Sequence, residues 1–190
     1  MGQERSSGSC FRRATASAGG ENSDRGRITG QHNRESASGR HRGTKKNGPQ
    51  SIGKSRGGWT TKIHMVAADA RTAITFSLSP GQAGDAPAGR ALLSKLGAPN
   101  RPLHLLMDRA YEGNETRQLA LDLGFIPVVP PLSTRISPWE YDRQMYKRRN
   151  EIERLFRRLK GFRRIFSRFE KLDIMFIAFI SFALIIDGLR

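Results

Sequence analysis

The spacing of apolar residues divides the chain at about residue 58. Residues 1–58 are rich in Gly, Ser and Arg and show no apolar periodicity, so we expect a disordered basic arm. From Trp59 onward, apolar runs alternate with polar ones, which predicts one folded domain over residues 59–190. About 130 residues are enough for a single hydrophobic core.

The folded part shows alternating β and α patterns. A hairpin is predicted over residues 59–78, with a turn at 68–71, and a helix over 86–96 follows with Asp85 as its N-cap. Short strands are predicted over residues 103–107 and 125–129, on either side of a helix over 114–123. This order favours an α/β fold in which helices cover a mixed sheet.

Two further helices are predicted at the end of the chain. Residues 141–160 place Tyr146, Arg149, Glu153, Arg157 and Lys160 on one helical face, opposite an apolar stripe. One face can therefore be buried while the other meets an anionic ligand. The last helix, over residues 172–189, is almost wholly apolar, and we expect it to be buried and to complete one side of the core.

The charge of the chain narrows its class of partner. The 190 residues include 33 Lys and Arg against 17 Asp and Glu, giving a net charge of +16, which indicates a polyanion such as nucleic acid. The single cysteine, Cys10, excludes an intrachain disulfide and a Cys-based zinc site. The apolar run 174–186 is too short to span a bilayer, so we expect no membrane contact.

Two acidic residues are candidates for catalysis. Asp108 follows an apolar strand, at the edge of the sheet where ligands of open α/β folds bind. Glu153 lies on a helix that could pack over this edge. Two such carboxylates can hold Mg²⁺, and two ions about 3.5 to 4 Å apart support displacement at a phosphodiester.

The basic face of the same helix is a candidate for DNA binding. Arg149 and Lys160, with the neighbouring Arg157 and Arg164, would hold the strand by its phosphates. Tyr146 would stack on a base or sugar, or brace the helix. Each residue also has a structural interpretation: an Asp after a strand often caps a turn, and a Glu among arginines often forms an i,i+4 ion pair.

Four motifs together resemble those of a known family. They are Gly57-Gly58-Trp59-Thr60-Thr61-Lys62-Ile63-His64, Pro80-Gly81-Gln82 with Asp85, Asp108-Arg109-Ala110-Tyr111, and the Y-x2-R-x3-E-x6-K spacing of Tyr146, Arg149, Glu153 and Lys160. From about Lys45 to its end, the chain resembles the DDE transposases of bacterial insertion sequences. Within these it is similar to the group named after insertion sequence five.

The resemblance carries several implications. It implies a ribonuclease H-like fold and an Asp, Asp, Glu triad that binds two Mg²⁺ ions, with Mn²⁺ as an alternative. Asp108 matches the second Asp and Glu153 the Glu, so both are expected to be metal ligands. It further implies DNA as partner, at both the element ends and the target. A homo-oligomer on DNA and a bacterial cytoplasmic location at the nucleoid are compatible with it.

The chain departs from the family at the first catalytic Asp. The family carries this residue in an Asp-Ser-Thr motif upstream of the Lys-Lys-Asn-Gly segment, and no such motif is present. Asp24 and Asp69 are poor substitutes, because one lies in the basic arm and the other in the predicted hairpin turn. We therefore expect the sheet to lack its first, central strand and the enzyme to be impaired.

A shift of reading frame would explain the missing motif. When the chain is read back into codons one base out of phase, from the second base of the Gly30 codon, the allowed codons include Asp-Ser-Thr. Our hypothesis is that residues 1–43 are translated out of frame. Two functions then remain: a truncated or frameshifted transposase, or a non-catalytic DNA-binding remnant that regulates or inhibits transposition.

Overall fold

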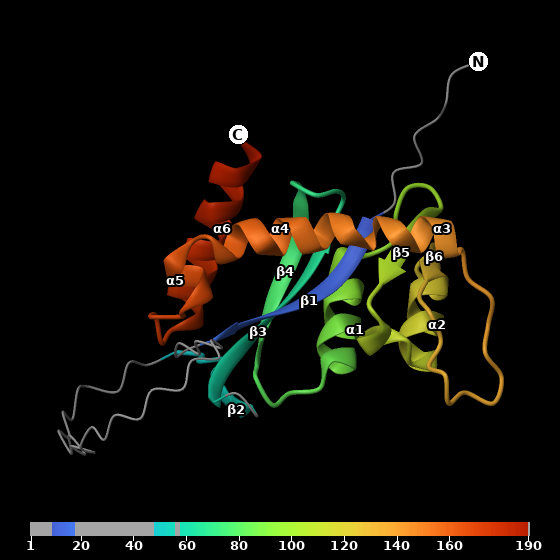
Figure 1. The fold of residues 1–190 in the computed structure, drawn as a ribbon, viewed down its shortest axis with the longest axis horizontal. Coiled ribbons are helices and arrows are strands. Elements are labelled where there is room, and N and C mark those ends of the chain that lie inside the picture. Colours follow the sequence, from blue (N-terminus) through green and yellow to red (C-terminus); the bar gives the residue numbers. More distant parts are fainter. Residues whose placement is uncertain (1–8, 18–47, 56–57, 190) are drawn as a thin grey trace, which may run out of the picture.

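Six strands form one mixed sheet in the computed structural model, which describes the backbone of residues 9–17 together with residues 48–55 and 58–189. The hydrogen-bonded order is β2-β3-β1-β5-β6, and β4 also pairs with β3 (Figure 1). The strands are β1 (Ser9–Ser17), β2 (Gly53–Ser55), β3 (Gly58–Ala67), β4 (Ala73–Pro80), β5 (Leu103–Met107) and β6 (Phe125–Val128).

The predicted hairpin is confirmed by β3 and β4, which pair antiparallel from Thr61 opposite Pro80 to Ala67 opposite Ala73. Its turn is fixed by Asp69, whose carboxylate accepts hydrogen bonds from the backbone N–H groups of Arg71 and Thr72. Short polar side chains that bond the backbone ahead of them favour such turns. The predicted strands over 103–107 and 125–129 are confirmed as β5 and β6.

The prediction that the central strand is missing is wrong. Strand β1 lies between β3 and β5, antiparallel to the first and parallel to the second. Thus residues 9–17 and β2 do not belong to a disordered arm. Strand β1 has no strict apolar alternation, and its position depends on pairing with two distant strands, which local pattern does not reveal. The hypothesis on residues 1–43 otherwise concerns segments outside the described residues.

Helices cover both faces of the sheet. Successive residues of a strand enter different cores: Met65 and Leu106 lie under the C-terminal helices, whereas Val66 and Leu105 lie under α1 and α2. The helices are α1 (Asp85–Leu96), α2 (Asn114–Asp122), α3 (Arg143–Tyr146), α4 (Asn150–Lys160), α5 (Arg163–Phe166) and α6 (Asp173–Gly188), with 3₁₀ turns η1 (Arg109–Tyr111) and η2 (Lys147–Arg149).

Two helix predictions need correction at their starts. Asp85 is the first residue of α1 and not its N-cap, a position that Gly84 takes without a side-chain hydrogen bond. The single helix predicted over 141–160 is divided into α3, η2 and α4, and it begins after Asp142, whose carboxylate caps Gln144 and Met145. The apolar stripe of α4 is buried as predicted, through Ile152, Leu155, Phe156 and Leu159.

The expectation that the last helix is buried is only half right. Helix α6 buries Phe176, Ile180 and Ala183 against the core, but it exposes a second apolar face, on which Ile174 is 72% and Phe182 61% exposed. Among the described residues, no helix is long and apolar enough to cross a membrane.

A buried arginine, Arg168, links the residues around β2 to the loop before α6. The guanidinium of Arg168 donates to Thr61 Oγ1 at 2.6 Å and to Asp173 Oδ1 at 2.6 Å, as well as to three backbone carbonyl oxygens. Asp173 in turn accepts from the backbone N–H and the hydroxyl of Ser51, each at 2.7 Å. Because a buried charge must be paired and hydrogen-bonded, this cluster fixes the residues before β2 against the loop before α6.

Candidate active site

Asp108 lies directly after strand β5 and is partly exposed. Its carboxylate accepts a hydrogen bond from the backbone N–H of Arg109 at 2.7 Å and so caps the 3₁₀ turn η1. This bond fixes the rotamer of the side chain at the C-terminal end of a parallel strand. The capping role and the catalytic role predicted for Asp108 are compatible, because a carboxylate has four lone-pair positions.

Glu153 lies in the first turn of α4, where the partial positive charge of the helix N-terminus favours an acidic side chain. It forms an ion pair with Arg149, in which Nη1 lies 3.0 Å from Oε1 and both side chains remain partly exposed. The i,i+4 ion pair predicted as the structural role of Glu153 is therefore present. The same contact places a cation beside the carboxylate that the sequence marks as a metal ligand.

The two carboxylates come from elements that pack together. The turn η2 lies against β5, and α4 crosses β1, the strand next to β5 (Figure 1). Within the part of the chain that the structure describes, no three His, Cys, Asp or Glu residues gather closely enough to hold a metal ion. The site thus offers Asp108 and Glu153 without a described third ligand.

Strand β1 supplies no acidic residue to this site. Its sequence, Ser-Cys-Phe-Arg-Arg-Ala-Thr-Ala-Ser, contains neither Asp nor Glu. Phe11 pairs with Met107 in the parallel register, so Arg12 is the residue next in register to Asp108. The strand position is filled, but the carboxylate expected of it is missing.

The two alternative acids do not replace it. The carboxylate of Asp69 is engaged with the turn between β3 and β4. The hydrogen bond from the backbone N–H of Arg71, aided by Thr72, lowers the pKa of Asp69 against the opposing effect of partial burial. Asp69 is thus a turn former, as predicted, while Asp24 lies outside the described residues.

Tyr146 packs at the boundary of the core. Its ring meets the ring of Tyr141 edge to face, with centroids 5.7 Å apart, and the guanidinium of Arg149 lies 5.4 Å from its centroid. Of the two predicted roles, stacking on DNA or bracing the helix, these contacts favour the second. Tyr146 holds Arg149, and Arg149 holds Glu153.

The other predicted DNA-binding residues differ in their contacts. Arg157 and Lys160 lie on the exposed face of α4. Arg164 forms an ion pair with Glu170 at 2.7 Å, and its guanidinium lies 4.8 Å from the ring centroid of Phe179 on α6. Arg157 and Lys160 are therefore better placed to meet phosphates than Arg164, which packs α5 onto α6.

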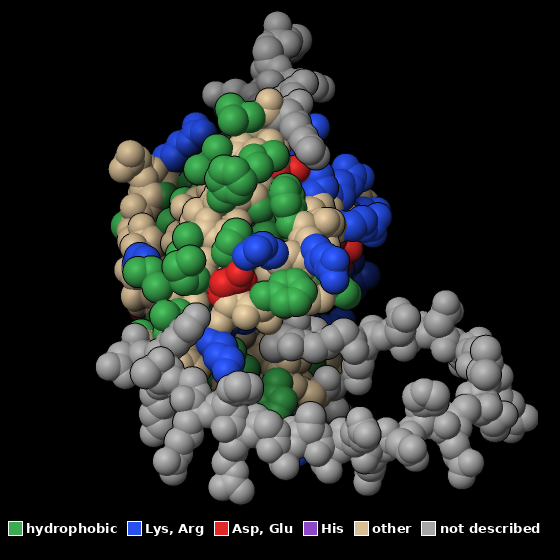
Figure 2. Space-filling view, turned by 90° about the vertical axis from the view of Figure 1, so that its left-hand side faces the viewer, with side chains coloured by type: hydrophobic (Ala, Val, Ile, Leu, Met, Phe, Trp, Pro, Cys, Tyr) green, Lys and Arg blue, Asp and Glu red, His purple; other side chains and the backbone are tan. Residues whose placement is uncertain are grey.

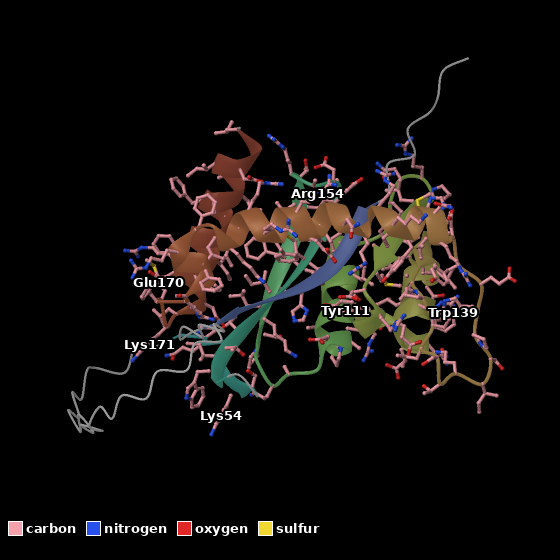
Figure 3. All side chains as sticks on the ribbon, in the orientation of Figure 1. Lys54, Tyr111, Trp139, Arg154, Glu170 and Lys171 are labelled. Atoms are coloured by element: carbon pink, nitrogen blue, oxygen red, sulfur yellow. The ribbon has the colours of Figure 1, made fainter. Side chains whose placement is uncertain are left out.

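A buried polar network joins the remaining motifs, and sequence reasoning gave these residues no role. Nδ1 of His64 lies 2.8 Å from the hydroxyl of Tyr111, and Nε2 lies 2.8 Å from Oγ of Ser79. All three residues are buried, and Tyr111 is labelled in Figure 3. The network fixes the turn after Asp108 to the centre of β3 and to the end of β4.

An ion pair makes a second link between motifs. Nζ of Lys62 on β3 lies 2.9 Å from Oδ1 of Asp85, and both side chains are almost fully buried. Gly81 enables the nearby turn, because a Cβ there would clash with the side chain of Thr60 and lie 2.9 Å from the carbonyl oxygen of Gly53. Two features of the sequence could have indicated these links. Lys62 and His64 lie within a strand that is otherwise buried, and Tyr111 follows Asp108 in the same motif.

Comparison with known proteins identifies the class. The family described as "Transposase DDE domain" matches residues 27–186, so the chain belongs to this family of DNA transposases. The family implies polynucleotidyl transfer on DNA, and its domains generally use divalent metal ions.

One similar protein belongs to an insertion sequence. It is named "Putative transposase for insertion sequence element IS6501", from Brucella ovis, and is 33% identical over 132 residues, covering 69% of this chain and 99% of the relative. No solved structure matches the chain significantly. These matches confirm the predicted resemblance to insertion-sequence transposases at the level of the family.

Proposed function

We propose that Asp108 and Glu153 are the metal ligands of this transposase and that Mg²⁺ is the ion they hold. The observation that carries the proposal is the packing of η2 and α4, the segment that bears Glu153, across the strands β5 and β1, next to the point where Asp108 follows β5. Both candidate ligands are carboxylates, which suit a hard cation that keeps several water ligands, and Mn²⁺ is compatible with the same oxygen donors.

The neighbouring residues would prepare the two carboxylates. The backbone N–H of Arg109 orients Asp108, and the guanidinium of Arg149 orients Glu153. When bound, such ions activate the attacking water or 3′-hydroxyl and stabilise the leaving oxygen of the phosphodiester. Tyr146 contributes by holding Arg149 in place.

DNA would lie along the exposed face of α4. Arg157 and Lys160 lie on this face, and phosphate contacts of this kind are the main source of affinity for DNA. The residues would position the strand relative to Glu153, which lies on the same helix four residues before Arg157. Contacts of this type carry no base specificity, so recognition of element ends and target needs further residues.

The strand order supports the ribonuclease H-like fold. A central strand, β1, is antiparallel to β3 and parallel to β5, and β5 is parallel to β6. We assign the chain to this fold and to the insertion sequence five group on its motifs. A DNA substrate and a single cysteine favour a bacterial cytoplasmic location at the nucleoid.

A second candidate function follows from strand β1. The strand has no acidic residue, and Arg12 stands next in register to Asp108. Two carboxylates in place of three would bind a pair of ions weakly. The chain would then be a non-catalytic DNA-binding remnant, truncated or frameshifted, that occupies element ends and inhibits transposition.

Strand cleavage separates the two functions. The substrate is DNA with terminal inverted repeats, incubated with the full chain in Mg²⁺, and the variants are Asp108→Ala and Glu153→Ala. Cleavage that both substitutions abolish supports the transposase. Absence of cleavage, with DNA binding that survives both substitutions and falls steeply with salt, supports the remnant.

A further inference from the structure

Helix α6 is apolar along its whole length between two engaged carboxylates. Residues 174–186 contain no charged side chain. Asp173 is bound by Arg168 and Ser51, and Asp187 is bound by Arg158 at 2.7 Å. The helix therefore presents neither of its acidic groups as a free charge to a partner.

The exposed residues of α6 form one continuous face. Phe176, Ile180 and Ala183 point into the core, as expected for positions three and four apart. By the same geometry, Ile174, Ile177, Phe182, Ile185 and Leu189 share the opposite side, and they are respectively 72%, 39%, 61%, 60% and 83% exposed.

The exposed apolar residues also include Met175 of the same helix, which is 49% exposed, and Phe166 and Phe169 before the helix, which are 44% and 59% exposed. Figure 2 shows hydrophobic side chains gathered on this side of the molecule. These eight side chains expose on the order of 800 Å² of surface, which exceeds the few hundred Å² that a monomer usually exposes in one patch.

We propose that this face pairs with the same face of a second copy of the chain. The patch is about as large as one side of a standard interface, roughly 800 Å² per partner. Two-fold pairing places a surface on itself, so like charges at its centre would oppose it. Residues 174–186 carry none, and Arg163 and Arg164 flank the patch at the end formed by Phe166 and Phe169.

Pairing through α6 would take place next to one end of the candidate DNA-binding face, because Lys160 is the last residue of α4 and is followed by α5 and α6. In Figure 1, α6 lies at one end of α4 and α3 at the other, with β5 close to α3. A dimer would present Arg157 and Lys160 from two copies to DNA. The inference does not depend on Asp108 or Glu153, so a failure of the proposed catalytic site would leave it unaffected.

Sedimentation equilibrium of the full chain, without DNA, tests the pairing. The chain is expected to dimerise at micromolar concentrations. The double variant Phe182→Ser/Ile185→Ser is expected to weaken the dimer at least 100-fold, whereas Ile136→Ser is expected to leave it unchanged, because Ile136 is 100% exposed in a distant loop. Circular dichroism of each variant checks that it folds.

A cross-link provides a second measurement that does not need a destabilised variant. Phe182→Cys in a Cys10→Ser background should form an intermolecular disulfide on mild oxidation, and Ile136→Cys in the same background should not. A chain that stays monomeric at about 100 times the micromolar concentration expected for dimerisation, and that forms no selective cross-link, would overturn the proposal. So would a monomer that binds anionic phospholipid vesicles through α6, since a lipid surface would then be the occupant.

Discussion

The hydroxyl of Tyr111 lies 2.8 Å from Nδ1 of His64, inside the core and three residues beyond Asp108. This contact joins the centre of β3 to the turn that follows the candidate catalytic strand. Because Ser79 occupies the other ring nitrogen of His64, the three side chains hold one another in place. Tyr111, which belongs to the same motif as Asp108, thus helps to hold Asp108 in position through contacts in the core.

Removal of this hydroxyl should destabilise the fold. Tyr111→Phe leaves a buried nitrogen of His64 without its partner, which should lower the free energy of unfolding by about 1 to 3 kcal/mol. Tyr141→Phe is the matched control, because Tyr141 is only half-buried and its ring contact with Tyr146 remains. Urea unfolding measures both variants, and equal losses in the two would contradict the assigned role.

Local patterns predicted most strands and helices but not the centre of the sheet. Strands β3 to β6 are marked by their own apolar residues, and α4 by its apolar stripe. In contrast, β1 is defined by the two strands that it joins. An almost wholly apolar helix such as α6 has no broad polar face to indicate which side meets solvent, so the sequence predicts it as buried.

Only part of the candidate site can be predicted from the sequence. Asp108 and Glu153 are predicted from their positions after a strand and on a helix, and from two motifs, and their metal-binding role is a proposal. The links from Lys62 to Asp85 and from His64 to Tyr111 join residues 23 and 47 positions apart. Contacts at such separations depend on the sheet register and cannot be inferred from spacing alone.

Acid should weaken the fold through Asp173. Burial raises the pKa of this carboxyl, but the hydrogen bonds from Ser51 and Arg168 outweigh it, so the pKa lies below its ordinary value of 3.8. A lowered pKa gives stability that is present above 3.8 and is lost as the pH falls through the folded value. Unfolding measured from pH 6 down to about pH 2 should show this loss.

Asp173→Asn should be less stable than the wild type near neutral pH and should depend less on acid, because it cannot lose a proton. The control is Asp122→Asn, since Asp122 is exposed at the end of α2. That variant should follow the wild-type curve. An Asp173→Asn curve parallel to wild type over the whole range would contradict the assigned role of Arg168 and Asp173.

Lys160 should contribute one phosphate contact. Lys160→Ala should weaken binding to any duplex and reduce the slope of log affinity against log salt by about 1. Lys95→Ala is the control, since Lys95 is also an exposed lysine in the last turn of a helix, α1, away from the candidate face. Fluorescence anisotropy at several salt concentrations measures both, and identical slopes would remove Lys160 from the interface.

The encoding nucleotide sequence decides the frame hypothesis. When it is read in the shifted frame that starts at the second base of the Gly30 codon, this sequence should encode Asp-Ser-Thr. The family match begins at residue 27 and so overlaps this segment. A shifted frame that encodes another sequence there would exclude the hypothesis and leave the Arg-bearing β1 as the native strand.

The central claim is that Asp108 and Glu153 bind the same divalent ion. Paramagnetic Mn²⁺ tests it most directly, because the ion broadens the nuclear magnetic resonance signals of nearby amides whether or not the chain cleaves DNA. In the wild type, the amide signals of Arg109 and Glu153 should broaden together at the same Mn²⁺ concentration. Asp108→Asn should abolish both effects, and Asp122→Asn should leave both unchanged. Broadening at Glu153 that persists in Asp108→Asn, or no selective broadening at either position, would contradict the account.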